Sequence, residues 1–164
     1  MRSNIIVKVP QKVVSICSLL ESKKATNIFV CDTTKKQNVV DYYVIATLES
    51  SGDIKSVSDF ILEESVRMPL VYGESKMEGS SLSGWVVLDF DDVCAHLFTK
   101  EVRARYNFDR FVNEGGNLVP FKRIQQDLKI QKQKEEAKAK IELKRKLKEE
   151  AKNKAKTTPK TKKG

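Results

Sequence analysis

The chain has 164 residues, of which 40% are apolar, so its length and composition suit one domain of ordinary core size with an appendage. The net charge of +9 comes from residues 122–164, with 17 Lys and Arg against 6 Asp and Glu, whereas residues 1–121 hold 14 against 16 and lack the charge of a nucleic-acid-binding fold. No apolar stretch reaches the roughly 20 residues of a membrane span and no signal or transit segment opens the chain, so we expect a cytoplasmic protein without a membrane contact.

The first half of the chain alternates between two periodicities. Apolar residues recur at helical spacing after Pro10, and again after the polar stretch Ser50–Asp53. This polar stretch is suited to capping the start of the second helix, and Pro69 ends that helix. Runs rich in β-branched and aromatic residues indicate strands. The expected elements are helices over about 10–24 and 54–67 and strands over 27–32, 39–48 and 70–72, followed by a polar loop over 73–84.

The strongest local signal is a hairpin. Two β-rich runs, 84–90 and 93–98, are divided by Asp91-Asp92, and two turn residues between such runs predict a tight turn. Both runs are nearly all apolar, so we expect the hairpin to be covered on both faces. Short helices should follow, one capped by Thr99 and a second over 106–112.

A break at Glu114–Asn117 marks the expected boundary between an α+β domain, residues 1–116, and a Lys/Glu-rich tail, residues 117–164. The domain should be a small mixed sheet flanked by helices, because strands and helices do not alternate regularly. The tail predicts a solvated helix that frays after Thr157, and its apolar residues are too sparse for a coiled-coil seam.

The residues that carry chemistry give weak signals. Asp89 and Asp91 lie two apart, a spacing that would allow a Mg²⁺ site, but Asp is also a favoured turn residue. His96 is the only histidine and stands without a nucleophile or metal ligands in a motif. We therefore expect no cofactor, no metal and no enzymatic activity; the rival hypothesis is a nucleotidyltransferase that uses both carboxylates.

Two further features have alternative readings. Trp85, Tyr106 and Phe108 flank the hairpin, and they form either part of the core or an aromatic patch that contacts another protein. The basic tail is either a solvated helix without a specific partner or a weak contact to rRNA through phosphates.

The hairpin region resembles the signature of the ribosomal silencing factor (iojap-like) family, W-x3-D-x2-D-V-x2-H followed by E-x-R-x2-Y. Upstream, residues 41–47 are similar to the family strand D-[YF]-x-V-I-x-T, and Glu78-Gly79 is similar to its E-G. The matching signature residues are Trp85, Asp89, Asp92, Val93, His96, Glu101, Arg103 and Tyr106.

This resemblance implies a compact domain with a nucleotidyltransferase-like fold that lacks the catalytic residues. It implies binding to the large-subunit ribosomal protein uL14, a block of small-subunit joining, and in many members a homodimer. A large-subunit assembly factor is the alternative. The implied contacts to uL14 are Trp85, Tyr106, Arg103, Asp89, Phe108 and Phe111, of which Arg103 and Asp89 either orient the aromatic side chains or pair with the partner. The implied ordering residues are His96, Asp41 and Asp92.

The chain departs from the family pattern at two places. The family usually has Ser-x-Arg-His after the second strand, where this chain has Gly52-Asp53 after Ser51, so two polar contacts are replaced. The segment after Tyr106 usually ends in Leu-Trp, and Phe111-Val112 stands there instead. The loss of that tryptophan shifts the expected contact toward Phe108 and Phe111.

Overall fold

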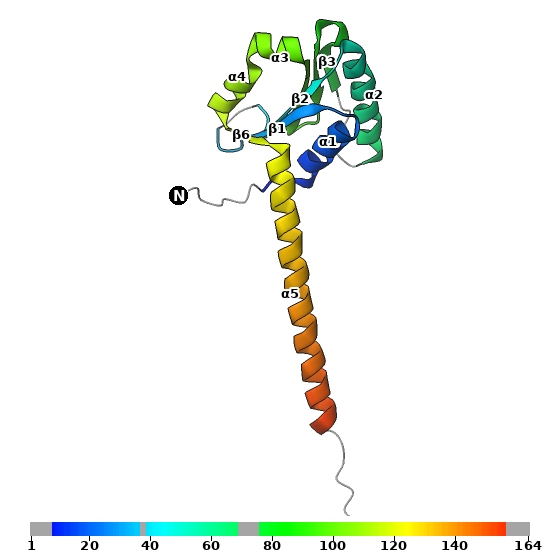
Figure 1. The fold of residues 1–164 in the computed structure, drawn as a ribbon, viewed down its shortest axis with the longest axis vertical. Helices are drawn as coiled ribbons and strands as arrows, with labels where there is room; N and C mark the ends of the chain where they lie inside the picture. The colour runs from blue at the N-terminus through cyan, green and yellow to red at the C-terminus, as the bar shows by residue number, and fades with distance from the viewer. Residues whose placement is uncertain (1–7, 37–38, 69–75, 157–164) are drawn as a thin grey trace, which may run out of the picture. The chain divides into compact units, whose positions relative to one another are not determined.

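A computed structural model describes residues 8–36, 39–68 and 76–156. The chain divides into two compact units, Met1–Ile124 and Gln125–Gly164, which we describe separately. The elements, in chain order (Figure 1), are α1 Gln11–Ser22, β1 Thr26–Asp32, β2 Tyr42–Leu48, α2 Ser51–Arg67, β3 Lys76–Ser80, a 3₁₀ turn Ser81–Ser83, β4 Trp85–Asp89, β5 Val93–Thr99, α3 Lys100–Tyr106, α4 Phe108–Gly115, β6 Asn117–Pro120 and α5 Phe121–Lys156.

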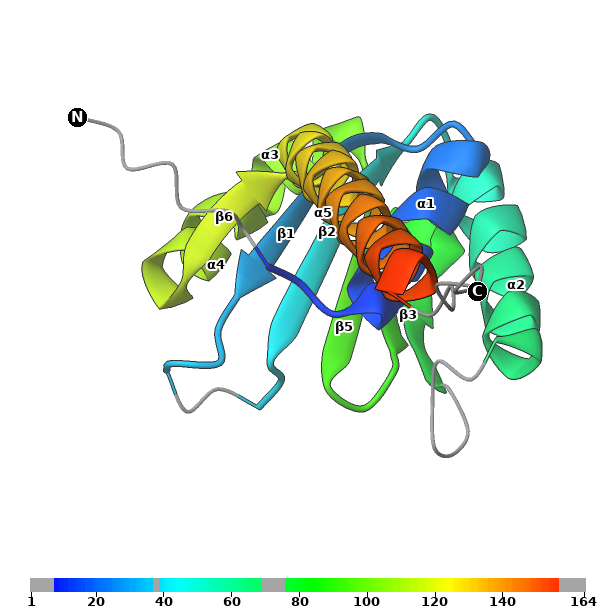
Figure 2. The same cartoon turned by 90° about the horizontal axis from the view of Figure 1, so that it is seen from below.

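The first unit is built on a six-stranded mixed sheet in the order β3-β4-β5-β2-β1-β6. Only β2 and β5 run parallel, and the other neighbours are antiparallel. Helices α1 and α2 lie on one side of the sheet, and α3 and α4 lie on the other (Figures 1 and 2). The predicted α+β class is therefore confirmed.

The core has two halves, one on each face of the sheet, and both arise from alternation along the strands. On one face, the buried Val44, Ala46 and Leu97 meet the buried apolar residues of α1 and α2. On the other face, Ile45 and Phe98 form a second cluster with residues of α3 and α4. Because successive side chains of a strand point to opposite faces, β2 and β5 supply both clusters.

The helix starts follow the predicted capping chemistry. The Ser50 Oγ accepts the Asp53 backbone N–H at 3.1 Å, and the Thr99 Oγ1 accepts the Val102 N–H at 3.4 Å. Each bond satisfies one backbone donor that an isolated first turn leaves unpaired. Both caps were thus correctly predicted, although α2 begins at Ser51, three residues before its expected start.

Two strands were not predicted. Residues 76–80, expected within a polar loop, form edge strand β3 against β4, and all five are exposed. Residues 117–120, expected to open the tail, form β6 against β1. This strand lies beyond the boundary expected after residue 116, and the folded unit continues to Ile124. The strand expected at 70–72 lies outside the described residues, as does the fraying point after Thr157.

The hairpin has its predicted turn but is not covered as expected. The Phe90 N–H donates to the Val93 carbonyl at 2.9 Å, and Asp91 takes a left-handed φ of 70°. Both faces of β5 are buried, yet on β4 only Val86 and Leu88 are, while Trp85 remains partly exposed. The prediction of cover on both faces was wrong for β4, because α3 and α4 leave part of that face open.

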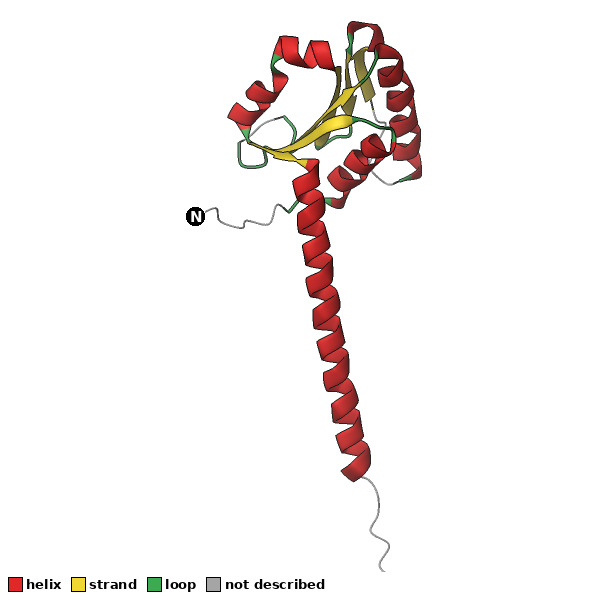
Figure 3. Cartoon of the chain, viewed as in Figure 1, coloured by secondary structure: helices red, strands yellow, loops and turns green. Residues whose placement is uncertain are grey.

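In the second unit, α5 continues as an uninterrupted helix to Lys156 (Figure 3). From residue 132 to 155 every residue is exposed. Glu142 and Lys146 form an i, i+4 ion pair, with 3.4 Å between carboxylate and ammonium. Within the described residues no helix is long and apolar enough to cross a bilayer.

Candidate protein-interaction surface

The face of the sheet beneath α3 and α4 carries a cluster of aromatic rings. The Trp85 indole of β4 stacks on the Phe98 ring of β5, with 4.9 Å between centroids, and meets the Tyr106 ring of α3 at 5.2 Å. The Phe108 ring of α4 lies 5.7 Å from the same indole. Ring pairs in this range of distances add to the energy of simple burial, so the cluster holds two strands and two helices together.

Gly84 allows the tryptophan strand to start close to α3. Its φ of 74° is left-handed, and a Cβ there would lie 2.7 Å from Val102 Cγ2 and 2.9 Å from Thr99 Oγ1. Only glycine adopts this conformation without strain and without a clash. The position of Trp85 under α3 therefore depends on the residue before it.

His96 lies inside the cluster rather than on its surface. It is 8% exposed, its ring is 4.3 Å from that of Phe108, and its Nδ1 accepts the Trp85 Nε1–H at 3.2 Å. Burial lowers the pKa of His96 to about 4. A neutral ring that accepts at Nδ1 carries its proton on Nε2, so this histidine orients the indole.

Exposure increases from the sheet outwards. Phe98 is fully buried, Trp85 and Phe108 are half-buried, Tyr106 is 58% exposed and Phe111 is 66% exposed. The Phe111 ring stands 5.9 Å from that of Phe108. We call these four residues, Trp85, Tyr106, Phe108 and Phe111, the aromatic surface: two exposed rings on a base of half-buried ones.

Arg103 supports this surface from inside. Its side chain is buried, its Nε donates to both carboxylate oxygens of Asp109 at 3.2 and 3.0 Å, and its Nη1 donates to the Asn27 carbonyl at 2.7 Å and the Thr47 Oγ1 at 2.8 Å. One guanidinium thus ties α3 to α4 and to two strands. Of the two roles that the sequence allowed, orienting the aromatics fits this position better than contacting a partner.

The acidic residues named from the sequence lie away from the aromatic surface. Asp89 ends β4, four residues from Trp85, and its Oδ1 accepts the Asp91 N–H at 3.0 Å. The Asp92 carboxylate pairs with the Lys12 ammonium, and its carbonyl accepts the Asp41 N–H at 2.9 Å. The Asp41 side chain is exposed, so only its backbone takes part in this ordering.

Two members of the arrangement were missed by sequence reasoning. The Tyr43 ring of β2 lies 5.6 Å from that of His96, and Asp109 is the acidic partner of Arg103. Strand alternation could have placed Tyr43 on the same face as Ile45. Asp109 could have been identified from its position in the first turn of α4, where an acidic residue is favoured. Among the described residues, no group of three or more His, Cys, Asp and Glu side chains has the arrangement of a metal site.

Comparison with known proteins gives consistent results. Residues 7–162 match the family model described as "Ribosomal silencing factor during starvation". The chain is 34% identical to the ribosomal silencing factor of Zymomonas mobilis over 92 residues, 56% of this chain and 67% of that protein. It is 28% identical to the Bacillus subtilis protein of the same name over 90 residues, 55% and 75% of the two chains. A crystal structure from Chromobacterium violaceum shares the fold, with a TM-score of 0.56, 22% identity and coverage of 65% and 88%.

Proposed function

The chain belongs to the ribosomal silencing factor family, and on that premise we propose that it binds ribosomal protein uL14 on the large subunit through its aromatic surface. A domain bound there would occupy the place where the small subunit docks and so repress translation. The mechanism is occupancy, which requires no cofactor and no catalytic residue. The observation that carries the proposal is the exposure of Tyr106 and Phe111 on a base of half-buried rings.

The energetics of the aromatic surface suit protein recognition. Aromatic side chains are enriched among the residues that dominate binding energy, because they bury a large area with few rotatable bonds. Trp85 and Phe108 support the exposed rings from below, so little conformational entropy remains to be lost on binding. A Kd near 1 μM corresponds to about −8 kcal/mol, which a few such anchors supply.

The remaining residues take supporting roles in the proposal. Arg103 and His96 hold the rings in place through the hydrogen bonds described above. Asp89, at the other end of β4 and away from the aromatic surface, provides a separate polar contact in this proposal. The tail adds electrostatic attraction to rRNA, and a homodimer is the expected state of the free protein.

The direct test is co-sedimentation with ribosomal subunits on sucrose gradients under conditions that allow the subunits to join. Tyr106→Ala and Phe111→Ala are preferable to Trp85→Ala, because both side chains are mostly exposed and their removal leaves no buried hydrogen-bond partner. We expect the wild type to migrate with the large subunit and to reduce the peak of joined subunits. The double variant, which combines Tyr106→Ala and Phe111→Ala, should do neither.

Val66→Ala is the matched control, since Val66 is an 81% exposed apolar residue on α2, across the sheet. It should retain wild-type binding. If the folded double variant still binds and still prevents joining, the aromatic surface is not the contact. If the wild type binds immature particles in preference to mature subunits, a role in subunit assembly replaces silencing.

A further inference from the structure

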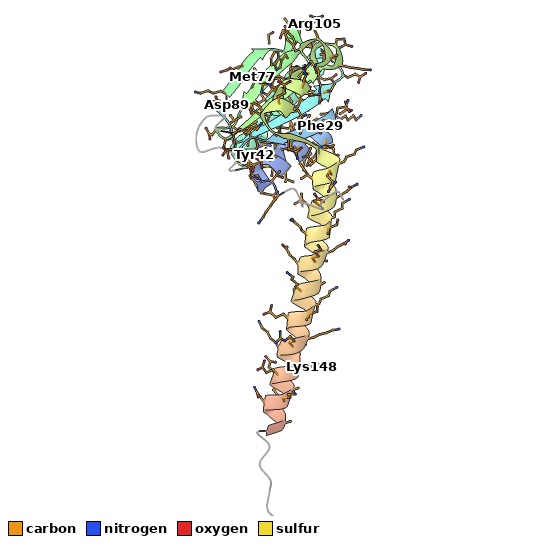
Figure 4. All side chains as sticks on the ribbon, turned by 90° about the vertical axis from the view of Figure 1, so that its left-hand side faces the viewer. Phe29, Tyr42, Met77, Asp89, Arg105 and Lys148 are labelled. Atoms are coloured by element: carbon orange, nitrogen blue, oxygen red, sulfur yellow. The ribbon has the colours of Figure 1, made fainter. Side chains whose placement is uncertain are left out.

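One face of α5 carries a row of cations. Lys134, Lys138, Arg145 and Lys152 are spaced by four, seven and seven residues, which places them within about 40° of one another around the helix at about 100° per residue. All four are exposed. The row extends for about 27 Å at 1.5 Å per residue, and Figure 4 shows the side chains of α5 projecting outward along the helix, with Lys148 labelled.

Carboxylates are kept out of this row. Glu135, Glu142 and Glu149 repeat at a spacing of seven residues in the adjoining sector, and Glu142 forms its ion pair with Lys146, outside the row. The opposite face instead mixes both signs, with Glu136 and Glu150 among several lysines. Between residues 134 and 152 the helix therefore has a positively charged sector without a carboxylate, although its sequence interleaves acidic and basic residues.

Other partners for this face fit poorly. Helices that lie on membranes need a continuous apolar face. The exposed large apolar residues of α5 instead form two sparse pairs, which project about 100–160° apart around the helix: Ile130 with Ile141, and Leu143 with Leu147. The same scatter removes the seam of a coiled coil. Single-stranded nucleic acid is held by stacking on aromatic rings, and the sequence has no aromatic residue after Phe121.

We infer that the row formed by Lys134, Lys138, Arg145 and Lys152 binds the phosphate backbone of double-stranded RNA. A straight series of charges on a continuous helix is complementary to an extended, regular series of phosphates, which a duplex presents. Arg145 adds a planar donor that can bind phosphate through two parallel hydrogen bonds. Phosphate contacts carry no direct base information, so binding is independent of sequence.

This inference rests on the part of the proposed function that gives the tail a contact to rRNA, and it specifies the RNA form and the residues. It does not depend on uL14, because the row and the aromatic surface lie in different units of the chain. A binding assay without ribosomes therefore tests it separately from silencing.

The experiment compares two full-length variants of equal net charge. The row variant carries Lys134→Gln, Lys138→Gln, Arg145→Gln and Lys152→Gln, and the control carries Lys129→Gln, Lys132→Gln, Lys140→Gln and Lys144→Gln, all on other faces. Lys, Arg and Gln have similar helix propensities, and circular dichroism should give equal helicity. Affinity for a short fluorescent RNA duplex of mixed sequence is measured from about 50 to 200 mM salt.

We expect the row variant to bind at least about ten-fold more weakly than the wild type at the lowest salt. The slope of the logarithm of the binding constant against the logarithm of the salt concentration should also become smaller in magnitude by roughly three to four. This change corresponds to about 0.9 for each of four lost phosphate contacts, the value known for B-DNA. The control should change affinity by less than about three-fold. Equal losses in both variants would overturn the inference, because net charge alone would then account for binding. Tighter binding to single-stranded RNA of equal length, or row-dependent binding to anionic vesicles but not to the duplex, would overturn it as well.

Discussion

The two faces of the sheet share the same strands but differ in what covers them. The face beneath α1 and α2 is mostly aliphatic and closed, with Val44, Ala46 and Ile61 fully buried. The face beneath α3 and α4 carries rings, a buried histidine and a buried arginine, and its exposure rises to 66% at Phe111. The face under α1 and α2 therefore contributes mainly to stability, whereas the face under α3 and α4 leaves a group of side chains partly exposed.

Helix length contributes to this difference. Helices α1 and α2 have 12 and 17 residues, whereas α3 and α4 have 7 and 8. At 1.5 Å per residue the short pair spans about 10–12 Å each, and it leaves the rings near Trp85 partly open. Because the short helices bury few aliphatic side chains, specific bonds such as those of Arg103 must hold them.

The largest effect on stability should come from the closed face. Ile61 is fully buried on α2, and Ile61→Ala should lower the free energy of unfolding by about 2–5 kcal/mol, through lost burial and the cavity left behind. Phe111→Ala, which removes a larger but exposed side chain, should change it by less than about 0.5 kcal/mol. Urea denaturation of both variants measures the contrast, and equal losses would mean that the two faces contribute alike.

The buried histidine should make the stability of the open face depend on pH. Burial lowers the pKa of His96 from 6.5 to about 4, so the unfolded chain takes up a proton first as the pH falls. The free energy of unfolding should therefore decrease between pH 6.5 and 4, by at most about 3.5 kcal/mol at about 1.4 kcal/mol per pKa unit. Denaturation curves measured at several pH values in this range give the free energy of unfolding at each pH. This free energy should depend less on pH in His96→Phe than in the wild type. An unchanged pH dependence would contradict the lowered pKa of His96.

Loss of the buried guanidinium should loosen the short helices. Arg103→Met removes the bonds to Asp109, Asn27 and Thr47, and should cost about 1–3 kcal/mol, since Asp109 is partly solvated and retains water as a partner. Hydrogen exchange should accelerate in residues 100–115 more than in α2. Arg110→Met, which removes an exposed ion pair to Glu114, is the control and should have little effect.

The sequence predicted the local features well. Apolar periodicity gave α1 and α2, the β-rich runs gave β1, β2 and the hairpin, and the cap residues Ser50 and Thr99 gave the helix starts. The charged composition indicated a solvated helix for the tail. Each of these features depends on neighbours within one or two turns, which is the range over which periodicity and capping act.

What the sequence determined by itself was therefore the type of each main element, the fold class and the set of aromatic candidates. Tertiary structure decided the edge strands β3 and β6, because their hydrogen bonds come from β4 and β1 rather than from their own residues. It also decided which candidates are exposed and which are held inside. Arg103 bonds to groups 56 and 76 residues away, and no local pattern specifies contacts at that separation.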